Sequence, residues 1–243
     1  MTPEMGHRPA AGVAAAPHAH AGTSIGRTMG LVILALLPAT ALGLGQFGWP
    51  AILLFALTVS ATLITEAACL QLAGKPLRVH LLDGSALVTG WLLAMSLPPW
   101  APWWIGVLGA VIAIVLGKQV FGGTGQNLFN PAMVARVALL IAFPLEMTSY
   151  TAPDPLWSAG ALDLHEGLAV TFAGQVPDGF SGATALGHVR TELGRGLELD
   201  AALAGAYSPA AGALGTIGGS MGETSALLLL TGGLLLIYLR VIT

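Results

Sequence analysis

The sequence predicts an all-α polytopic membrane protein, and its composition and hydropathy carry that prediction. The chain of 243 residues is 55% hydrophobic and only 9% charged, and its mean hydropathy is +0.79. Soluble domains usually carry about 25% charged residues, so this chain has too few charges to cover a surface in water. Apolar runs recur along the chain between short polar, glycine- or proline-rich turns.

The apolar runs have the length that a bilayer requires. A membrane core takes about 20 apolar residues per helix, and about six transmembrane helices are expected here. The predicted spans are residues 28–46, 50–73, 81–97, 102–121, 128–145 and 224–243. The segment 146–222 holds no comparable run, and we expect it to form one large hydrophilic loop.

The N-terminal segment, the cysteine content and the net charge exclude several kinds of segment, site and partner. Residues 1–25 are rich in Ala, Gly and Pro and lack the apolar core of a signal peptide, which predicts a flexible tail. A single cysteine, Cys69, excludes an intrachain disulfide and a CxxC metal site. The net charge of −3 argues against a nucleic acid as partner. No metal site and no catalytic residue are predicted.

The positive charges of the short loops predict the orientation. Lys and Arg collect on the cytoplasmic side of membrane proteins. With a cytoplasmic N-terminus, one side receives Arg8, Arg27, Lys75, Arg78, Lys118 and Arg240. The segment 146–222 then faces outward, which is the periplasm if the chain lies in the inner membrane of a Gram-negative cell.

The stretch "FGGTGQNLFNPAMVAR", residues 121–136, predicts a break in the helical pattern. Asn130 suits a helix N-cap, and Pro131 suits the first turn of the following helix. Glycine-rich unwound backbone at membrane depth occurs where it is buried in protein or lines a cavity, as at binding sites of transporters. The alternative is a tight loop capped by Asn130.

Ionisable residues inside predicted spans are candidates for an ion pathway. Glu66 lies within the second span and Asp83 near the start of the third. A charge in a membrane span is costly and indicates function by default. Structural alternatives stand beside this hypothesis: Asp83 can cap a helix that starts at "DGSA", and Arg136 can neutralise Glu66 or Asp83.

The segment "DGFSGATAL", residues 178–186, presents two hydroxyl groups in a small, glycine-rich loop. A serine or threonine hydroxyl needs an activating base to act as a nucleophile, and the stretch 178–184 contains neither His nor Lys. We therefore interpret Thr184 as an acceptor for a modifying enzyme. The stretch resembles the flavinylation motif of periplasmic flavin transferases, which attach FMN to the threonine through a phosphoester. The matching residues are Asp178, Gly179, Ser181, Gly182, Ala183 and Thr184.

Three further segments, residues 83–104, 117–149 and 218–243, resemble one protein family. Together with the motif, they follow one another in the order that this family shows. It is the family of the D subunit of the Rnf ion-translocating electron-transport complex, which also includes the B subunit of the Na⁺-translocating NADH:quinone reductase. The resemblance implies a membrane repeat of about five helices, a flavin-bearing loop and a second, inverted repeat. Since family members are longer, we expect this sequence to be truncated at the C-terminus after the first helix of the second repeat.

The resemblance implies a division into a cytoplasmic tail at 1–25, a membrane repeat at 26–145, a periplasmic flavin loop at 146–222 and the first helix of a truncated repeat at 223–243. It also implies a flavoprotein subunit of a translocase that couples electron transport between ferredoxin and NAD to movement of Na⁺ or H⁺. Implied partners are the iron–sulfur and flavin subunits of the complex and a flavin transferase. A second, non-covalent flavin such as riboflavin is an open expectation, and a channel or transporter without flavin is the alternative function.

Overall fold

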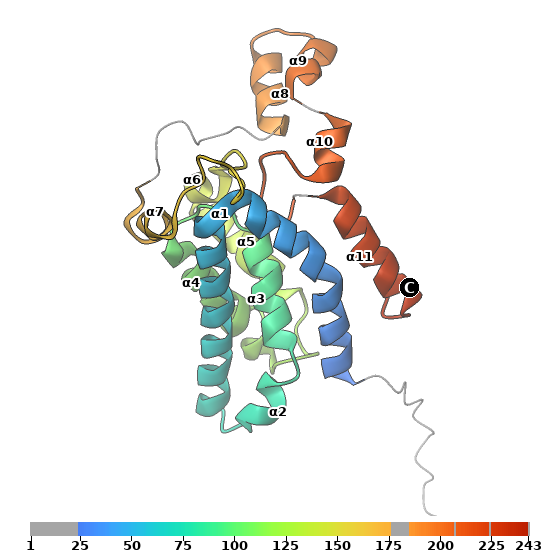
Figure 1. The fold of residues 1–243 in the computed structure, drawn as a ribbon. Helices are drawn as coiled ribbons and strands as arrows, with labels where there is room; N and C mark the ends of the chain where they lie inside the picture. The colour runs from blue at the N-terminus through green and yellow to red at the C-terminus, as the bar shows by residue number, and fades with distance from the viewer. Residues whose placement is uncertain (1–23, 176–184, 207, 224, 243) are drawn as a thin grey trace, which may run out of the picture.

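The computed structural model describes residues 24–175, 185–206, 208–223 and 225–242. Within these residues the regular elements are helices and no β-strand occurs, which confirms the all-α prediction. Figure 1 shows a bundle of apolar helices with several short helices gathered at one end.

The first two predicted spans form one bent helix, α1 (Ile25–Leu72). Gly48 breaks its helical geometry with φ 74° and ψ −162°, and Pro50 follows. Glycine tolerates a positive φ at little cost, whereas proline removes a backbone donor, so the pair accounts for the bend. The two arms of α1 meet at the end of the molecule that carries the short helices (Figure 1).

The third predicted span is the helix α3 (Ser85–Ser96), which the short helix α2 (Leu77–Leu81) precedes. α3 packs closely on the second arm of α1, because Gly90 has no side chain: a Cβ there would lie 2.8 Å from Thr62 Oγ1. On the first arm, Thr40 Oγ1 accepts a hydrogen bond of 2.9 Å from Trp91 Nε1. Small residues at helix crossings are typical of packing in membranes.

The fourth and fifth predicted spans contain the breaks that build the site. α4 (Trp103–Val111) continues into a π-helical turn, η1 (Ile112–Leu116), and a 3-10 turn, η2 (Gln119–Phe121). After a glycine-rich loop, α5 (Pro131–Ala142) begins with Asn130 as its N-cap, and Asn130 Oδ1 accepts from Ala132 N at 3.0 Å. This confirms the predicted cap and the position of Pro131.

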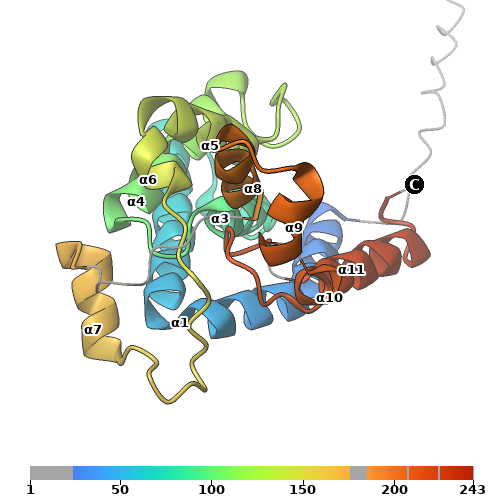
Figure 2. The same cartoon turned by 90° about the horizontal axis from the view of Figure 1, so that it is seen from above.

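The segment 146–222 is more structured than a single hydrophilic loop. Its described parts contain short helices: α7 (Leu164–Leu168) with η3 (Ala169–Ala173), α8 (Ala185–Gly194), α9 (Leu199–Ala206) and α10 (Pro209–Leu214). α6 (Pro144–Thr148) leads into them. In Figure 2, α7 lies on one side of the bundle and α10 on the other.

The end of this segment returns to the bundle. Met221 N donates to Leu97 O at 3.2 Å and Gly222 N to Met95 O at 2.7 Å, and Met221 is fully buried. α11 (Ala226–Tyr238) follows and packs on the first arm of α1, where Gly232 lies against the backbone of Ala35.

Within the described residues, two helical segments are long and apolar enough to cross a membrane, Ile25–Leu72 and Trp103–Phe121. Three apolar helices in the same ranges are shorter: α3, α5 and α11. Large apolar side chains point outward from these helices, among them Ile64, Ile141 and Leu230, each more than 60% exposed. A surface of this kind suits lipid and not water, in line with a membrane protein.

Segments predicted to share one side of the membrane do gather at one end of the bundle. Lys75 Nζ donates to Gly122 O at 2.9 Å, and Gly26 lies beside the backbone of Asp83. The start of α1, the turn around α2 and the loop after η2 therefore lie together, opposite α6 to α10 (Figure 1).

Candidate functional site

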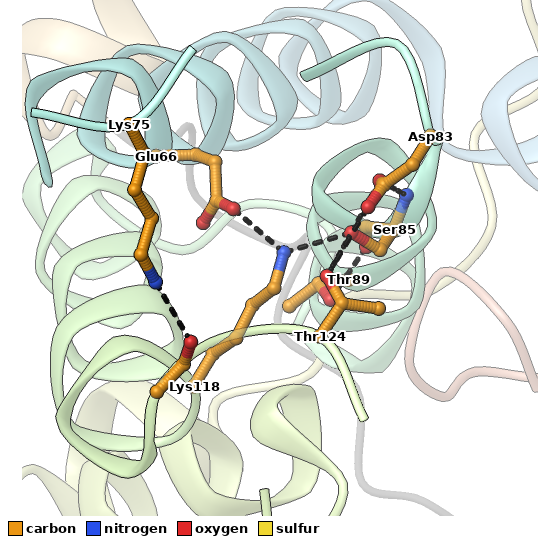
Figure 3. Close-up of polar contacts among 8 residues, drawn as sticks. Glu66, Lys75, Asp83, Ser85, Thr89, Lys118 and Thr124 are labelled. Carbon is orange, nitrogen blue, oxygen red and sulfur yellow. Dashed lines mark hydrogen bonds and ion pairs between the residues drawn. The ribbon is translucent and has the colours of Figure 1, made fainter. Parts of the chain in front are cut away.

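A buried polar network occupies the end of the bundle where α1 ends and α3 begins (Figure 3). Its centre is an ion pair between Lys118 Nζ and Glu66 Oε1 at 2.8 Å, with side chains only 2% and 1% exposed. Lys118 Nζ also donates to Ser85 Oγ at 2.8 Å. Three segments distant in sequence thus meet at one ammonium group.

Glu66 is buried because it belongs to the inward stripe of the second arm of α1. The stripe has a spacing of four residues and consists of Leu54, Thr58, Thr62, Glu66 and Leu70, all buried. The two threonine hydroxyls donate to their own helix, Thr58 to Leu54 O and Thr62 to Thr58 O, both at 2.7 Å. They do not compete for the glutamate, so Glu66 is left for a partner from another helix.

Lys118 reaches Glu66 because the helix before it is underwound by a π-helical turn. Gly117 N donates to Ile112 O at 3.0 Å, a bond to the fifth residue back. A π turn inserts one extra residue, which rotates the following side chains by about 100° relative to a regular helix. Gly117 itself lies against Pro131, where a Cβ would come within 2.9 Å of the proline Cα.

Asp83 organises the start of α3. Its Oδ1 accepts from Ser85 N at 2.7 Å and from Ser85 Oγ at 2.6 Å. Gly84 is the N-cap residue of α3, so Asp83 lies one residue before the cap and binds the first backbone N–H of the helix through a local side-chain turn. Because Ser85 Oγ donates to Asp83 while it accepts from Lys118, the serine connects the carboxylate of Asp83 to the ion pair.

The glycine-rich loop closes the network. Thr124 Oγ1 donates to Asp83 Oδ2 at 3.2 Å and lies 3.0 Å from Ser85 Oγ. Around it, Gly122, Gly123 and Gly125 have φ values of 113°, 108° and 85°. These positive values confirm the predicted unwound backbone, since side chains other than glycine rarely adopt them.

Two cavities border the network. The larger has a volume of about 460 Å³ and combines apolar walls with polar groups, among them Lys118, Ser85, Thr89, Thr124, Asn127 and Asn130. The smaller has a volume of about 80 Å³ and is lined by Glu66 with Lys75 and His80. Thr124 lines both cavities. Lys118 lines the larger cavity and Glu66 the smaller one, so their ion pair connects the two.

The second carboxylate oxygen of Glu66 does not take part in the ion pair. Glu66 Oε2 is buried and has no hydrogen-bond partner within the described part of the chain. A buried, unsatisfied carboxylate oxygen is costly and is rare in folded proteins. Chemically, the arrangement offers a carboxylate that can accept a proton or contribute a ligand to a cation, beside an ammonium group that now neutralises it.

The two acidic residues predicted from the sequence belong to the same network, whereas the predicted partner was wrong. Among the described residues the ion pairs are Lys118–Glu66 and Arg195–Glu192, so Arg136 neutralises neither Glu66 nor Asp83. The charge of Arg136 acts on Tyr150 instead. The pKa of Tyr150 is raised, because partial burial and the charge of Glu223 outweigh the opposing effect of Arg136.

Lys118 is the functional candidate that sequence reasoning missed. We expected it at the cytoplasmic end of a span, as one of several loop charges, but it is buried. The signal was present, because Lys118 falls within the predicted span 102–121, and the rule that singled out Glu66 applies to it as well.

The flavinylation motif, residues 178–184, lies outside the described residues. The helix α8 starts directly after it, at Ala185. No group of three or more His, Cys, Asp or Glu that could hold a metal ion occurs in the described ranges.

Comparisons with known proteins match this chain along nearly its whole length. The model of the NQR2, RnfD, RnfE family matches residues 12–243. A protein of Halorhodospira halophila, named as the D subunit of an ion-translocating oxidoreductase complex, is 57% identical over 229 residues, covering 94% of this chain and 64% of the relative. Proteins of the same name from Stutzerimonas stutzeri and Rhodobacter capsulatus are 59% and 49% identical and cover 90% and 98% of this chain. The chain spans 62–65% of the length of these relatives.

Proposed function

The chain belongs to the NQR2, RnfD, RnfE family, and from this premise we propose that it is the membrane flavoprotein subunit of an ion-translocating oxidoreductase. In this proposal it takes part in electron transport between ferredoxin and NAD, coupled to movement of Na⁺ or H⁺. The relatives that share up to 59% identity with it carry the name of such a subunit. No complete active site is assigned to this chain alone.

The observation that carries the proposal is the buried network of Lys118, Glu66, Ser85 and Asp83. Ionisable groups buried among apolar helices are costly and mark ion or proton pathways in membrane proteins. Here Glu66, whose Oε2 has no hydrogen-bond partner among the described residues, lines one cavity, and its partner Lys118 lines another. An ion pathway through Glu66 and Asp83 fits these contacts.

The cofactor in this proposal is FMN, held covalently through a phosphoester on the hydroxyl of Thr184. Bound flavin supplies one- and two-electron redox chemistry, to which the protein adds position and electrostatics. Asp178, Gly179, Ser181, Gly182 and Ala183 serve recognition by a flavin transferase in the periplasm. The tether keeps the flavin at a fixed range from the next electron carrier.

The larger cavity suits a second, non-covalent flavin. Its volume of about 460 Å³ lies within the range of about 300–1,000 Å³ that small-molecule sites occupy. Apolar walls from Ile25, Met29, Val88 and Leu92 suit a flat aromatic ring, whereas Asn127 and Asn130 offer amide groups for its polar edge. The Lys118 ammonium adds one positive charge to this cavity.

In this proposal the iron–sulfur centres belong to partner subunits in the bacterial inner membrane. The 243 residues contain a single cysteine, whereas an iron–sulfur cluster takes several thiolate ligands. The proposed orientation places the N-terminus in the cytoplasm and the segment 146–222 in the periplasm, as the positive charges of the short loops indicate.

The experiment that tests the proposal is in-gel flavin fluorescence after co-expression with a flavin transferase. Thr184→Val keeps the branched side chain and removes the oxygen, so we expect covalent fluorescence to vanish. Ser181→Ala removes the competing hydroxyl, and we expect it to keep a covalent flavin. Covalent FMN that persists in Thr184→Val would refute the assignment.

A channel or secondary transporter without flavin is the second candidate. The observation that favours it is the unwound loop at Gly122, Gly123 and Gly125, which borders a cavity in the manner of broken transporter helices. A purified complex in which neither denaturing gels nor solvent extraction reveal flavin would select this alternative.

A further inference from the structure

Lys118 lies between the two cavities and is the residue that connects their linings. It lines the larger cavity, and its ammonium is bonded at 2.8 Å to Glu66, which lines the smaller one. In Figure 3 the ammonium lies between Glu66 and Ser85. A change of charge in the larger cavity therefore acts first on Lys118.

The ammonium has room for one more partner. Lysine offers three N–H donors, and two of them are directed to Glu66 and Ser85. Within the described residues no acceptor takes the third. A negative charge in the larger cavity would compete with Glu66 for the same ammonium, because buried charges interact strongly where water does not screen them.

Glu66 is poised to respond to such competition. It is 1% exposed and its Oε2 has no partner in the described part of the chain, so Lys118 is its single compensating charge there. The other positively charged or titratable side chains that line the smaller cavity are Lys75 and His80, and Lys75 is engaged by Gly122 O at 2.9 Å. If Lys118 turns away, the carboxylate must take up another positive charge, because an uncompensated buried charge is unfavourable.

The backbone around Lys118 permits this movement. Gly117 ends the π-helical turn before it, and Gly122 and Gly123, with positive φ, follow the short turn η2. The lysine side chain is long and unbranched, so its ammonium can exchange partners by rotation of side-chain torsions while the helices stay in place.

We propose that Lys118 is a charge switch that couples the two cavities. When the occupant of the larger cavity gains an electron and a negative charge, the ammonium turns from Glu66 to the occupant. Glu66 then binds one monovalent cation, H⁺ or Na⁺, through the smaller cavity. This inference rests on the proposed non-covalent flavin as the occupant.

The step balances in charge and electrons. An iron–sulfur or flavin carrier of a partner subunit is oxidised by one electron, and the occupant of the larger cavity is reduced by it. The Lys118–Glu66 hydrogen bond breaks and one from Lys118 to the occupant forms. One cation enters from the aqueous side to Glu66. When the occupant passes its electron to the next iron–sulfur or flavin carrier of the complex, it loses its negative charge, Lys118 returns to Glu66 and the cation is released.

The test is redox-difference infrared spectroscopy of the purified, assembled complex, reduced with dithionite. In the wild type we expect a carboxyl or carboxylate band that Glu66→Gln removes. Lys118→Met should abolish this band, whereas Arg78→Met, which removes an exposed cation at the same end of the bundle, should leave it. A band that shifts in D₂O identifies the cation as a proton, and one that depends on Na⁺ concentration identifies it as sodium.

Three outcomes overturn the switch, and a fourth overturns the occupant on which it rests. The switch is wrong if the wild type holds a reducible non-covalent flavin but shows no band assignable to Glu66, or if the band persists in Lys118→Met. If extraction of the wild-type complex yields no non-covalent flavin, the proposed occupant is wrong as well. Should Lys118→Met fail to assemble, Lys118→Arg gives a second test, since a guanidinium bonds the carboxylate differently, and an unshifted Glu66 band contradicts the switch.

Discussion

The described part of the chain contains two ion pairs of equal length in very different settings. Lys118–Glu66 and Arg195–Glu192 both have an N···O distance of 2.8 Å. The first joins residues 52 positions apart and is buried at 2% and 1% exposure. The second lies within one turn near the end of α8, and its side chains are 68% and 17% exposed.

The two ends of this molecule hold their polar side chains in different ways. At the end with Lys118, the buried polar network exists because segments distant in sequence pack together. The proposed flavin attachment, in contrast, depends on a contiguous motif of the sequence, residues 178–184, which lies outside the described residues. Changes in the network should therefore affect folding and function together, and changes in the motif should separate them.

The largest effect is expected for Lys118→Met. This substitution leaves the charge of Glu66 buried without a partner, which costs about 3–5 kcal/mol in comparable cases. The measurement is the midpoint of SDS-induced unfolding of the protein in mild detergent. Restoring neutrality with Lys118→Met/Glu66→Gln should recover most of the loss, and a double variant as unstable as the single one would contradict the role of charge.

The second-largest loss of stability is expected where α3 crosses the second arm of α1. In Gly90→Ala the new Cβ would lie 2.8 Å from Thr62 Oγ1 and 3.2 Å from Val59 Cα, so we expect a loss of about 1–3 kcal/mol. Gly30→Ala is the control, because nothing lies within 4 Å of its Cβ. There, alanine should stabilise the helix by up to about 1 kcal/mol. Equal effects of both substitutions would show that close packing at Gly90 does not matter.

A smaller effect is expected where a single hydrogen bond links α3 to the first arm of α1. Trp91→Phe removes the bond from Nε1 to Thr40 Oγ1 and keeps an aromatic ring against Phe55, whose centroid lies 5.0 Å away. One neutral hydrogen bond contributes about 0.5–1.5 kcal/mol. Unfolding in the same SDS titration would reveal it, and an unchanged midpoint would contradict this link between the arms.

The smallest effect is expected at the exposed pair. Arg195→Ala removes the partner of Glu192, but exposed ion pairs contribute only about 0–1 kcal/mol, and salt screens them. The free energy of unfolding should stay within about 1 kcal/mol of the wild type, and in-gel flavin fluorescence should equal that of the wild type. A loss as large as that of Lys118→Met would erase the contrast between the two ends.

The class of fold, the break after η2 and the cap of α5 could all be predicted from the amino-acid sequence. Hydropathy indicates whether a segment is suited to lipid or to water, and glycine, proline and asparagine restrict or permit particular backbone conformations at their own positions. These are local effects, so they needed no tertiary information. The motif around Thr184 is likewise local, and its role as a flavin acceptor stays a prediction.

The partner that neutralises Glu66 could not be predicted from the sequence and is visible in the folded chain alone. The sequence offered Arg136, yet the structure joins Glu66 to Lys118 across 52 residues. The choice depends on a π-helical turn at Ile112–Leu116 that re-aims Lys118 and on the close approach of Gly117 to Pro131. Hydropathy averages over such a turn and does not detect it. Partners of a buried charge are set by helix phase and packing, which are properties of the folded chain.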